Sequence, residues 1–540
     1  MKPIGFRLIA AFSFALAIAA ALSASTAPRY GGILRVEMLG ARISIDPREW
    51  KDGSPEFARN EKMAALVFDR LVALDNYGRF QPQLATEWTH DATYKRWQFT
   101  LRLGVKFSDG SLLTAKGVVA ALQPLLPSTQ QISPGENDVV FQSSASMPDL
   151  LEELASGKYF IYRVQSDGTL LGTGPFFVVD SPGDENLDGK AVSQPNDTSS
   201  ASVSRNSPKS SHLRFRANGD AWSGRPFVDA IDVTLNVTPL RALFDLQLGK
   251  ADLVELSPEL VHRATQDNLR VWTSSAVTFY GLRFDEPQAI PTDPKLRESL
   301  SLALDRTTMA NVLLQRQAEP SCTLLPQWLS GYAFLFHLEG NVARAKEIRA
   351  ALPANVAAGS APLRLRVNAP GDLAKLLGER VAVNARQSSI AVQIVNASAQ
   401  HSAGNADSAS PAVQPSGVHL FVWRYSSLAP RAELDSLVTT MHLEKTVDTS
   451  TVTSSDPEQL YAREKRILGE RQILPLIALP EFVGLGQNVR DWLPASWGEW
   501  HLADVWLDGS SSSASQPGAA SSAEPTAMPL APVSNPGAKP

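Results

Sequence analysis

One stretch of this 540-residue sequence carries carboxylates at the spacing of a cation site. Residues 184–189, Asp-Glu-Asn-Leu-Asp-Gly, match the first half of a calcium-binding loop of pattern D-x-N-x-D-G. Such a loop needs a bidentate glutamate at its twelfth position, and here that position is Pro195. No flanking helices are evident. The pattern favours an ordinary acidic surface loop, with calcium as the alternative, and we expect neither a metal nor another cofactor.

The rest of the sequence offers no catalytic constellation. The motifs HExxH, GxSxG and GxxxxGK[ST] are all missing, and the 8 histidines are scattered without ligand spacing. The single cysteine, Cys322, excludes an internal disulfide, a CxxC redox pair and a multi-cysteine zinc site. We expect its side chain to be a buried small apolar group. These observations favour a binding protein over an enzyme.

Composition narrows the class of protein further. The chain is too long for one core, so we expect two or three domains. Lys+Arg 50 against Asp+Glu 55 gives a net charge of -5 without a basic stripe, and nucleic acid is therefore not an expected partner. A hydrophobic content of 44% is that of a soluble globular protein.

Residues 97–115 show how the local elements should follow one another. Trp97, Phe99, Leu101 and Leu103 alternate with polar residues, which is the period of a strand with one buried face. Residues 109–110, Asp-Gly, then favour a turn, and Thr114 is placed to cap a helix that begins near residue 115. The segment predicts a strand, a tight turn and a helix in that order, all serving as scaffold.

The longer segment that contains this unit resembles a known family signature. Residues 68–110, FDRLVALDNYGRFQPQLATEWTHDATYKRWQFTLRLGVKFSDG, are similar to the signature of family 5 extracellular solute-binding proteins, the peptide and nickel receptors of ABC importers. Further matches follow in the family's order. They are Gly31 to Val36, Ile45 to Pro47, Gly172 to Phe176, Asn218 to Pro226, Tyr280 to Asp285, and Asp293 to Arg306. After residue 320 the similarity weakens, and residues 474–477, Leu-Pro-Leu-Ile, resemble the strand that returns to the first lobe.

The resemblance implies an α/β fold of two lobes, of the periplasmic-binding-protein type, with an extra small subdomain in lobe I. Lobe I would comprise residues 28–60, 172–285 and 471–508, with a loop insertion at 181–212. The small subdomain would cover 61–171 and lobe II 286–470. Ligands of this family bind between lobes that close by hinge motion. The partners implied are a small or peptide-like ligand and the permease subunits of an ABC transporter, and we expect a monomer.

The ligand-binding residues implied by the resemblance include one departure from the family. They are Met38, Gly40, Thr173, Trp423, Arg424, Tyr425 and Ser426. Peptide binders of the family carry roughly "W-aDypDP" near residue 423, and the first Asp pairs with the peptide's ammonium. Counted from Trp423, that position is Ser426 and the second Asp position is Ala429. A hydroxyl lacks the charge for strong ammonium capture, so this position should no longer bind it.

Two alternatives stay open at this segment. Either the register differs by a residue or two, or Asp435 supplies the carboxylate from nearby. The aromatic side chains of Trp423 and Tyr425 could stack on a ligand or simply pack in lobe II. If no carboxylate is present, the ligand should be uncharged at that end or belong to another class, such as an oligosaccharide, an opine or a metal chelate.

The first 27 residues resemble a secretory signal peptide. Lys2 and Arg7 precede an apolar run from residue 8 to 22, and small residues at 23–27 suit cleavage. No cysteine lies at the cleavage region, which favours a free periplasmic protein of the Gram-negative type over a lipoprotein. Residues 509–540 are almost wholly Ser, Ala, Pro and Gly, typical of a disordered tail. A receptor-derived sensor or interaction protein is the alternative to a transport receptor.

Overall fold

The computed structural model describes six ranges of the chain: residues 27–179, 212–284, 293–352, 362–396, 417–443 and 456–509. The calcium-like motif lies outside these ranges. The same holds for nearly all of the predicted signal segment, the insertion at 181–212 and the tail from residue 509. Among the described helices, none is both long enough and apolar enough to span a bilayer.

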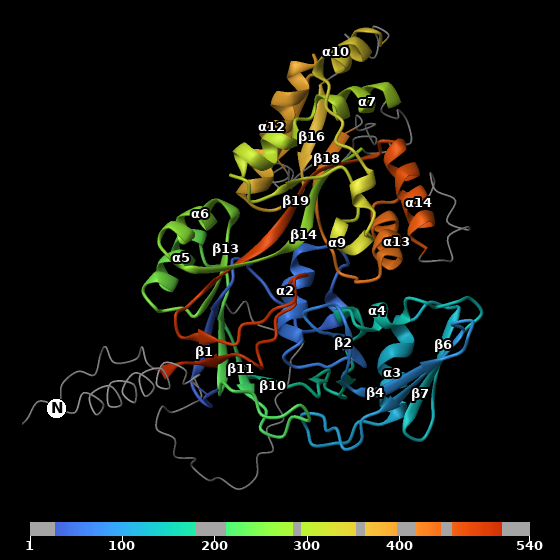
Figure 1. Cartoon of the computed structure of the whole chain (residues 1–540), viewed down its shortest axis with the longest axis vertical. Helices are drawn as coiled ribbons and strands as arrows, with labels where there is room; N and C mark the ends of the chain where they lie inside the picture. The colour runs from blue at the N-terminus through green and yellow to red at the C-terminus, as the bar shows by residue number, and fades with distance from the viewer. Residues whose placement is uncertain are drawn as a thin grey trace, which may run out of the picture.

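An eleven-stranded sheet runs through both lobes (Figure 1). The strand order is β10-β11-β12-β1-β13-β19-β14-β18-β16-β17, and β15 pairs with β19 beside this path. The lobe I strands are β1 (Ile33–Glu37), β10 (Phe176–Val179), β11 (His212–Ala217), β12 (Ala230–Thr234) and β13 (Leu253–Leu256). The lobe II strands are β15 (Glu319–Pro320), β16 (Leu363–Val367), β17 (Val392–Asn396) and β18 (Gly417–Arg424).

Two long strands join the lobes. β14 (Arg270–Phe284) and β19 (Ile473–Leu485) pair antiparallel from Arg270 opposite Leu485 to Arg283 opposite Ile473. At one end β19 also pairs with β13, and at the other end β14 also pairs with β18. Register shifts interrupt the ladder near its middle, around Ala276. The sheet is therefore continuous from one lobe into the other.

Helices cover the sheet, and their ends follow the capping rules. Lobe I has α2 (Pro55–Ala64), α5 (Pro239–Gln247) and α6 (Pro258–Gln266). Lobe II has α7 (Pro294–Ala303), α8 (Arg306–Thr308), α9 (Gln327–Ser330), α10 (Val342–Ala350), α12 (Asp372–Gln387), α13 (Pro430–Thr440) and α14 (Pro457–Gly469). At the start of α7 the side chain of Asp293 accepts the Lys295 N–H, and Pro294 follows as the first helical residue.

The small subdomain forms around an antiparallel sheet of order β4-β5-β7-β6. Its elements are β2 (Val72–Leu74), β3 (Phe80–Pro82), β4 (Ala85–His90), β5 (Arg96–Leu101), α3 (Ala115–Leu122), β6 (Gln130–Pro134), β7 (Asp138–Ser143), α4 (Leu150–Leu154), β8 (Arg163–Val164) and β9 (Leu170–Leu171). Two further strands, β20 (Val489–Arg490) and β21 (Trp506–Leu507), pair near the end of the described chain.

The strand, turn and helix predicted for residues 97–115 are confirmed, with one correction. Trp97, Phe99 and Leu101 are buried on one face of β5, and Thr114 caps α3 by accepting the Gly117 N–H. Leu103, predicted on the same buried face, is 73% exposed. The reason is that β5 ends at Leu101 and the chain turns away at Gly104, whose φ of 78° is left-handed.

The packing also moves one predicted boundary. The division between residues 60 and 61 falls inside α2. Met63, Ala64 and Phe68 beyond it belong to the core around β1 rather than to the core of the small subdomain, which begins with Leu71. We therefore propose a boundary near residue 69, and the other predicted boundaries likewise stay a proposal.

A buried glutamate links α14 to the residues on both sides of α9. Glu464 is fully buried, its Oε1 accepts the Leu324 N–H at 2.6 Å, and its Oε2 accepts the Tyr332 hydroxyl at 2.9 Å. Burial raises the pKa of Glu464 to about 7, even though these hydrogen bonds favour the carboxylate. Because the native state then holds the proton more tightly than the unfolded chain, this group lowers stability as pH rises from about 4.5 to about 7.

We expect Glu464→Gln to remove this loss. Relative to the wild type, the free energy of unfolding of the variant should improve by about 1–3 kcal/mol between pH 5 and pH 8, since glutamine does not titrate. Urea unfolding at both pH values measures the difference. If variant and wild type differed by the same free energy of unfolding at pH 5 and at pH 8, this result would contradict the raised pKa of Glu464.

Candidate functional site

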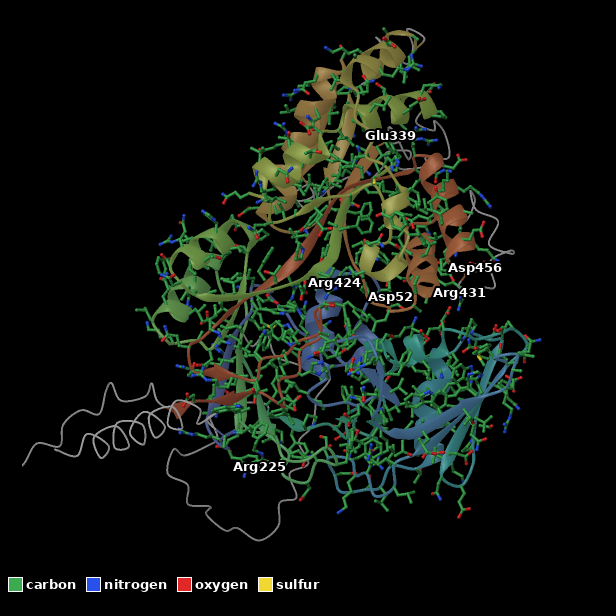
Figure 2. The ribbon with its side chains drawn as sticks, in the orientation of Figure 1. Asp52, Arg225, Glu339, Arg424, Arg431 and Asp456 are labelled. Atoms are coloured by element: carbon green, nitrogen blue, oxygen red, sulfur yellow. The ribbon has the colours of Figure 1, made fainter. Side chains whose placement is uncertain are left out.

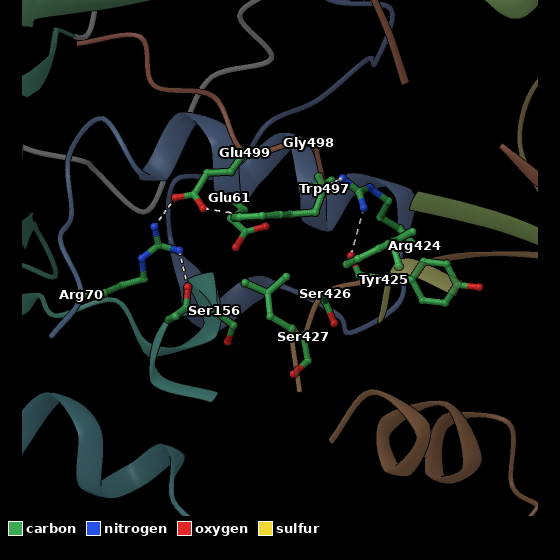
Figure 3. Close-up of a pocket in the computed structure, with 14 residues that line it drawn as sticks. Glu61, Arg70, Ser156, Arg424, Tyr425, Ser426, Ser427, Trp497, Gly498 and Glu499 are labelled. Carbon is green, nitrogen blue, oxygen red and sulfur yellow. Dashed lines mark hydrogen bonds and ion pairs between the residues drawn. The ribbon is translucent and has the colours of Figure 1, made fainter. Parts of the chain in front are cut away.

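A cavity lies where the two lobes and the small subdomain meet (Figure 3). Its walls come from α2, from residues 155–156 behind α4, from residues 424–428 at the end of β18, and from residues 497–499. The enclosed volume is about 30 Å³, which is room for one or two water molecules. A cavity of this volume admits one small polar group.

Two buried arginines stand on opposite sides of the cavity, and both are engaged (Figure 3). Arg70 donates through Nη1 to the Ala155 carbonyl at 2.5 Å and through Nη2 to the carboxylate of Glu499. Arg424 donates through Nη1 to the carbonyls of Val277 and Tyr425, both at 3.1 Å. Each guanidinium therefore joins chain segments that are far apart in the sequence.

A second set of ion pairs lies just behind this wall. Glu481 on β19 is 2.7 Å from Lys62 Nζ and 3.3 Å from Arg424 Nη2. Burial opposes ionisation here, but the two cations outweigh it and lower the pKa of Glu481. The pKa of Glu499 is lowered in the same way, because Arg70 offsets the cost of burial. Both carboxylates are thus held as anions and matched by cations.

Glu61 is the acid in the cavity wall without a cation bonded to it. It lies on the last turns of α2, and its carboxylate points into the cavity toward Ser427 (Figure 3). Its Oε1 accepts the Gly157 N–H at 2.8 Å. Burial and the nearby charge of Glu499 raise the pKa of Glu61 to about 7, although Arg70 and Arg424 favour the anion.

The opposite wall is a serine loop built on a buried carboxylate. Glu433, in the first turn of α13, accepts the indole N–H of Trp423 at 2.6 Å and the backbone N–H groups of Ser426 and Ser427 at 3.0 and 2.7 Å. Its side chain is fully buried, and burial raises its pKa. These bonds hold residues 426–427 in a fixed turn at the cavity edge.

The comparisons with known proteins identify the family. A model of the bacterial extracellular solute-binding proteins, family 5 Middle, matches residues 79–191 and 202–421, together more than half of the chain. The protein belongs to this family. The resemblance drawn from the sequence is therefore confirmed.

Individual relatives agree with this assignment. The chain is 26% identical over 326 residues to Protein XP55 of Streptomyces lividans, covering 58% of this chain and 57% of that protein. It is 26% identical over 293 residues to a probable di/tripeptide-binding protein 5 of Pseudomonas aeruginosa, covering 50% of this chain and 55% of that protein. The chain thus spans little more than half the length of these two relatives.

A solved structure shows the same fold. The murein tripeptide binding protein MppA of Escherichia coli superposes with a TM-score of 0.68 at 17% identity, over 88% of this chain and 98% of that one. The predicted α/β fold of two lobes is confirmed by this match. At this level of identity the match concerns the fold alone.

The structure brings three of the seven predicted site residues to the cavity. Arg424, Tyr425 and Ser426 line it. Trp423 does not, because its ring is 1% exposed and lies against Gly53, where any side chain would collide with the indole. The aromatic ring of Tyr425 is also largely packed in the core, where its hydroxyl donates to the Leu324 carbonyl at 2.9 Å.

The other three predicted residues lie in the scaffold of lobe I. Met38 is fully buried in the core around β1. Gly40 is buried where a side chain would collide with Arg59. Thr173 donates its hydroxyl to Asp69 Oδ2 at 2.7 Å, and the same oxygen accepts the Trp222 indole N–H. None of the three lines the cavity between the lobes.

Sequence reasoning missed the acids that matter here. Asp435, considered as the nearest alternative carboxylate, pairs instead with Arg463 at 2.5 Å and with Arg431 at 3.5 Å, and it does not line the cavity. Nothing in the sequence marked Glu61 as a cavity residue, because a single glutamate on an amphipathic helix is expected on its solvent-exposed face. The sequence gives only a weak indication for Glu433, since an acid in the first turn of a helix is usually explained by its interaction with the helix dipole.

Removing the charge of Glu433 should destabilise the protein. In Glu433→Gln the amide –NH₂ would face either the Trp423 indole N–H or the serine backbone N–H groups, so one buried donor loses its acceptor. We expect a loss of about 1–3 kcal/mol in the free energy of unfolding. Urea unfolding measures it, with Ser426→Ala as the control. The hydroxyl of Ser426 lies 3.4 Å from Glu433, so the control should change little.

Proposed function

We propose that this protein is a periplasmic receptor that binds a small, peptide-like solute between its lobes and delivers it to the permease subunits of an ABC importer. Membership in the family carries this proposal. The relative named for di- and tripeptides supports the class of solute. The signal-like N-terminus supports export. In this role the protein binds and releases its ligand without catalysing a reaction.

The protein would bind and release its ligand by closing and opening the cleft. Ion pairs across the cleft would shift the equilibrium between the two forms. Arg431 on α13 contacts Asp149 at 3.2 Å and Glu153 at 3.0 Å, at the near end of the small subdomain. Asp52 faces the same helix and accepts the Ser436 hydroxyl at 3.2 Å. Figure 2 shows Arg431, Asp52 and Arg424 at the level where lobe II meets the rest of the molecule. If these contacts form only in the closed cleft, as we propose, they favour closure.

The second candidate is a receptor-derived sensor or interaction protein without a transport role. The small cavity favours it, since a protein that never opens would need no larger space. The two candidates differ in whether the lobes move when a ligand binds. Native mass spectrometry of protein purified from its own periplasm would identify a retained ligand, and that ligand then serves in scattering experiments.

We expect the ligand to make the protein more compact. The radius of gyration from small-angle scattering should fall when the retained ligand is added back to stripped protein. An unchanged radius at saturation would contradict hinge closure and favour the static interaction protein.

The variant Arg431→Gln should shift the stripped protein toward the open form, because it removes the contacts to Asp149 and Glu153. We expect a larger radius of gyration without ligand and an affinity several-fold weaker, since closure then costs more. Arg344→Gln is the matched control, because it removes an exposed ion pair with Glu347 within α10. Equal behaviour of both variants would argue against a role of Arg431 in closure.

A further inference from the structure

A second cavity lies within lobe II, away from the cleft between the lobes. Its volume is about 400 Å³, which is the size of a small-ligand site. Its walls are residues 302–304 at the end of α7, 305–307 at the start of α8, 338–342 up to the start of α10, and the last residue of α12, Gln387. Figure 2 shows Glu339, one of the lining residues, higher in lobe II than Arg424.

A buried arginine in the wall of this cavity has no carboxylate bonded to it among the described residues. Arg306 is 6% exposed, and its Nε and Nη1 donate to the carbonyls of Pro475 at 2.7 Å and of Ser301 and Glu339 at 3.2 Å. Nη2 donates to the Ser301 hydroxyl at 3.5 Å, which leaves one of its two N–H groups without an acceptor in the described part of the chain. Burial lowers the pKa of Arg306 to about 10, so the guanidinium stays charged at neutral pH. A buried cation of this kind is stabilised by an anion beside it.

The two carboxylates that line the cavity are already paired with other cations. Asp305 lies 4.0 Å from Arg380. Glu339 lies 3.4 Å from Arg471. Together with Arg306, three arginines thus surround two carboxylates, and Arg306 carries the positive charge in excess.

Further hydrogen-bond donors lie around the same cavity. The N–H of Val342 begins α10, a helix of 9 residues without an acid in its first turn, and it has no acceptor among the described residues. The N-terminal end of a helix attracts negative charge. The side chains of Thr307, Asn341 and Gln387 also carry donors for which the described chain supplies no acceptor. A carboxylate or phosphate group could use these donors.

The apolar wall of the cavity decides between an inorganic and an organic anion. Leu302, Leu338 and Val342 line it, and the side chains of Leu338 and Val342 are 42% and 37% exposed. Inorganic phosphate would leave these side chains in water, whereas a short aliphatic chain would cover them.

We propose that this cavity binds a small organic anion, with its carboxylate at Arg306 and the start of α10 and its aliphatic part against Leu338 and Val342. The bound anion would connect the ends of α7, α10 and α12 and so stabilise lobe II. This site goes beyond the proposed receptor function and does not depend on it, because it lies outside the cleft.

Isothermal titration of the full chain with hexanoate, 1-hexylamine and inorganic phosphate tests the class of ligand. We expect hexanoate to bind at least about ten-fold more tightly than the other two, because hexylamine has the opposite charge and phosphate has no aliphatic part. Tighter binding of hexylamine would make Asp305 and Glu339 the binding groups, and tighter binding of phosphate would indicate an inorganic anion site. Either result would overturn the proposal, and so would a protein that binds none of the three.

The variant Leu338→Asp tests whether hexanoate binds in this cavity. It places a like charge at the rim and removes an apolar contact, so hexanoate should bind about ten-fold or more weakly. Leu335→Asp is the matched control, because Leu335 is 45% exposed in the same loop but does not line the cavity. The control should keep the affinity of the wild type. Equal affinities of the two variants would contradict the assigned site.

A further variant separates lost binding from lost folding. Arg306 joins three chain segments, so its replacement would test folding as much as binding. Val342→Asp instead supplies a carboxylate at the start of α10, where it suits the helix dipole. The melting temperature should equal or exceed that of the wild type, while hexanoate affinity should fall about ten-fold or more because the new carboxylate repels the ligand. Hexanoate binding that is unchanged in this variant would overturn the proposal.

Discussion

The antiparallel pairing of β14 with β19 is the constraint on which the rest of the structure depends. These two strands run from lobe I into lobe II; β19 also pairs with β13 at one end, and β14 also pairs with β18 at the other. Their backbone hydrogen bonds therefore place both walls of the cleft relative to each other. The register shifts near Ala276 weaken the ladder at the level of the cavity, where Trp328 donates to the Ala276 carbonyl at 2.7 Å. Irregularities of this kind bend a strand and increase its local twist.

The charged groups of the cleft are arranged so that burial is tolerated. Removing an ion from water is costly unless a partner lies within hydrogen-bond distance. Lys62 with Glu481 and Arg70 with Glu499 meet this condition through residues more than 400 positions apart. One acid on β19 and one in the segment after it thus neutralise the cations that α2 and the following residues bring into the cleft. Glu61 has a backbone N–H rather than a cation bonded to it among the described residues, and burial together with the charge of Glu499 raises its pKa to about 7.

Several local features were predictable because their causes are local. The start of α7 at Asp293 and Pro294, the cap at Thr114 and the buried face of Trp97 and Phe99 follow from neighbouring residues alone. The wrong prediction that Leu103 is buried also comes from reasoning on neighbouring residues alone. A period of two cannot tell where a strand ends, and the turn at Gly104 decides it. The role of Trp423 was ambiguous for a different reason. An aromatic residue at the end of a strand contacts a ligand only if no other part of the chain covers its ring. Here the segment at Gly53 covers the ring.

The sequence alone determined the family, the α/β character and the absence of an aspartate at position 426, since each depends on residue types in a known order. The tertiary structure decided which acids reach the cavity. Asp435 is near Ser426 in sequence but is paired with Arg463, whereas Glu61 is 365 positions from Ser426 and faces it across the cavity. The reason is physical. The interactions of a charged group in a cleft depend on the groups that surround it in space. The pairing of β14 with β19 brings those groups together from distant parts of the chain.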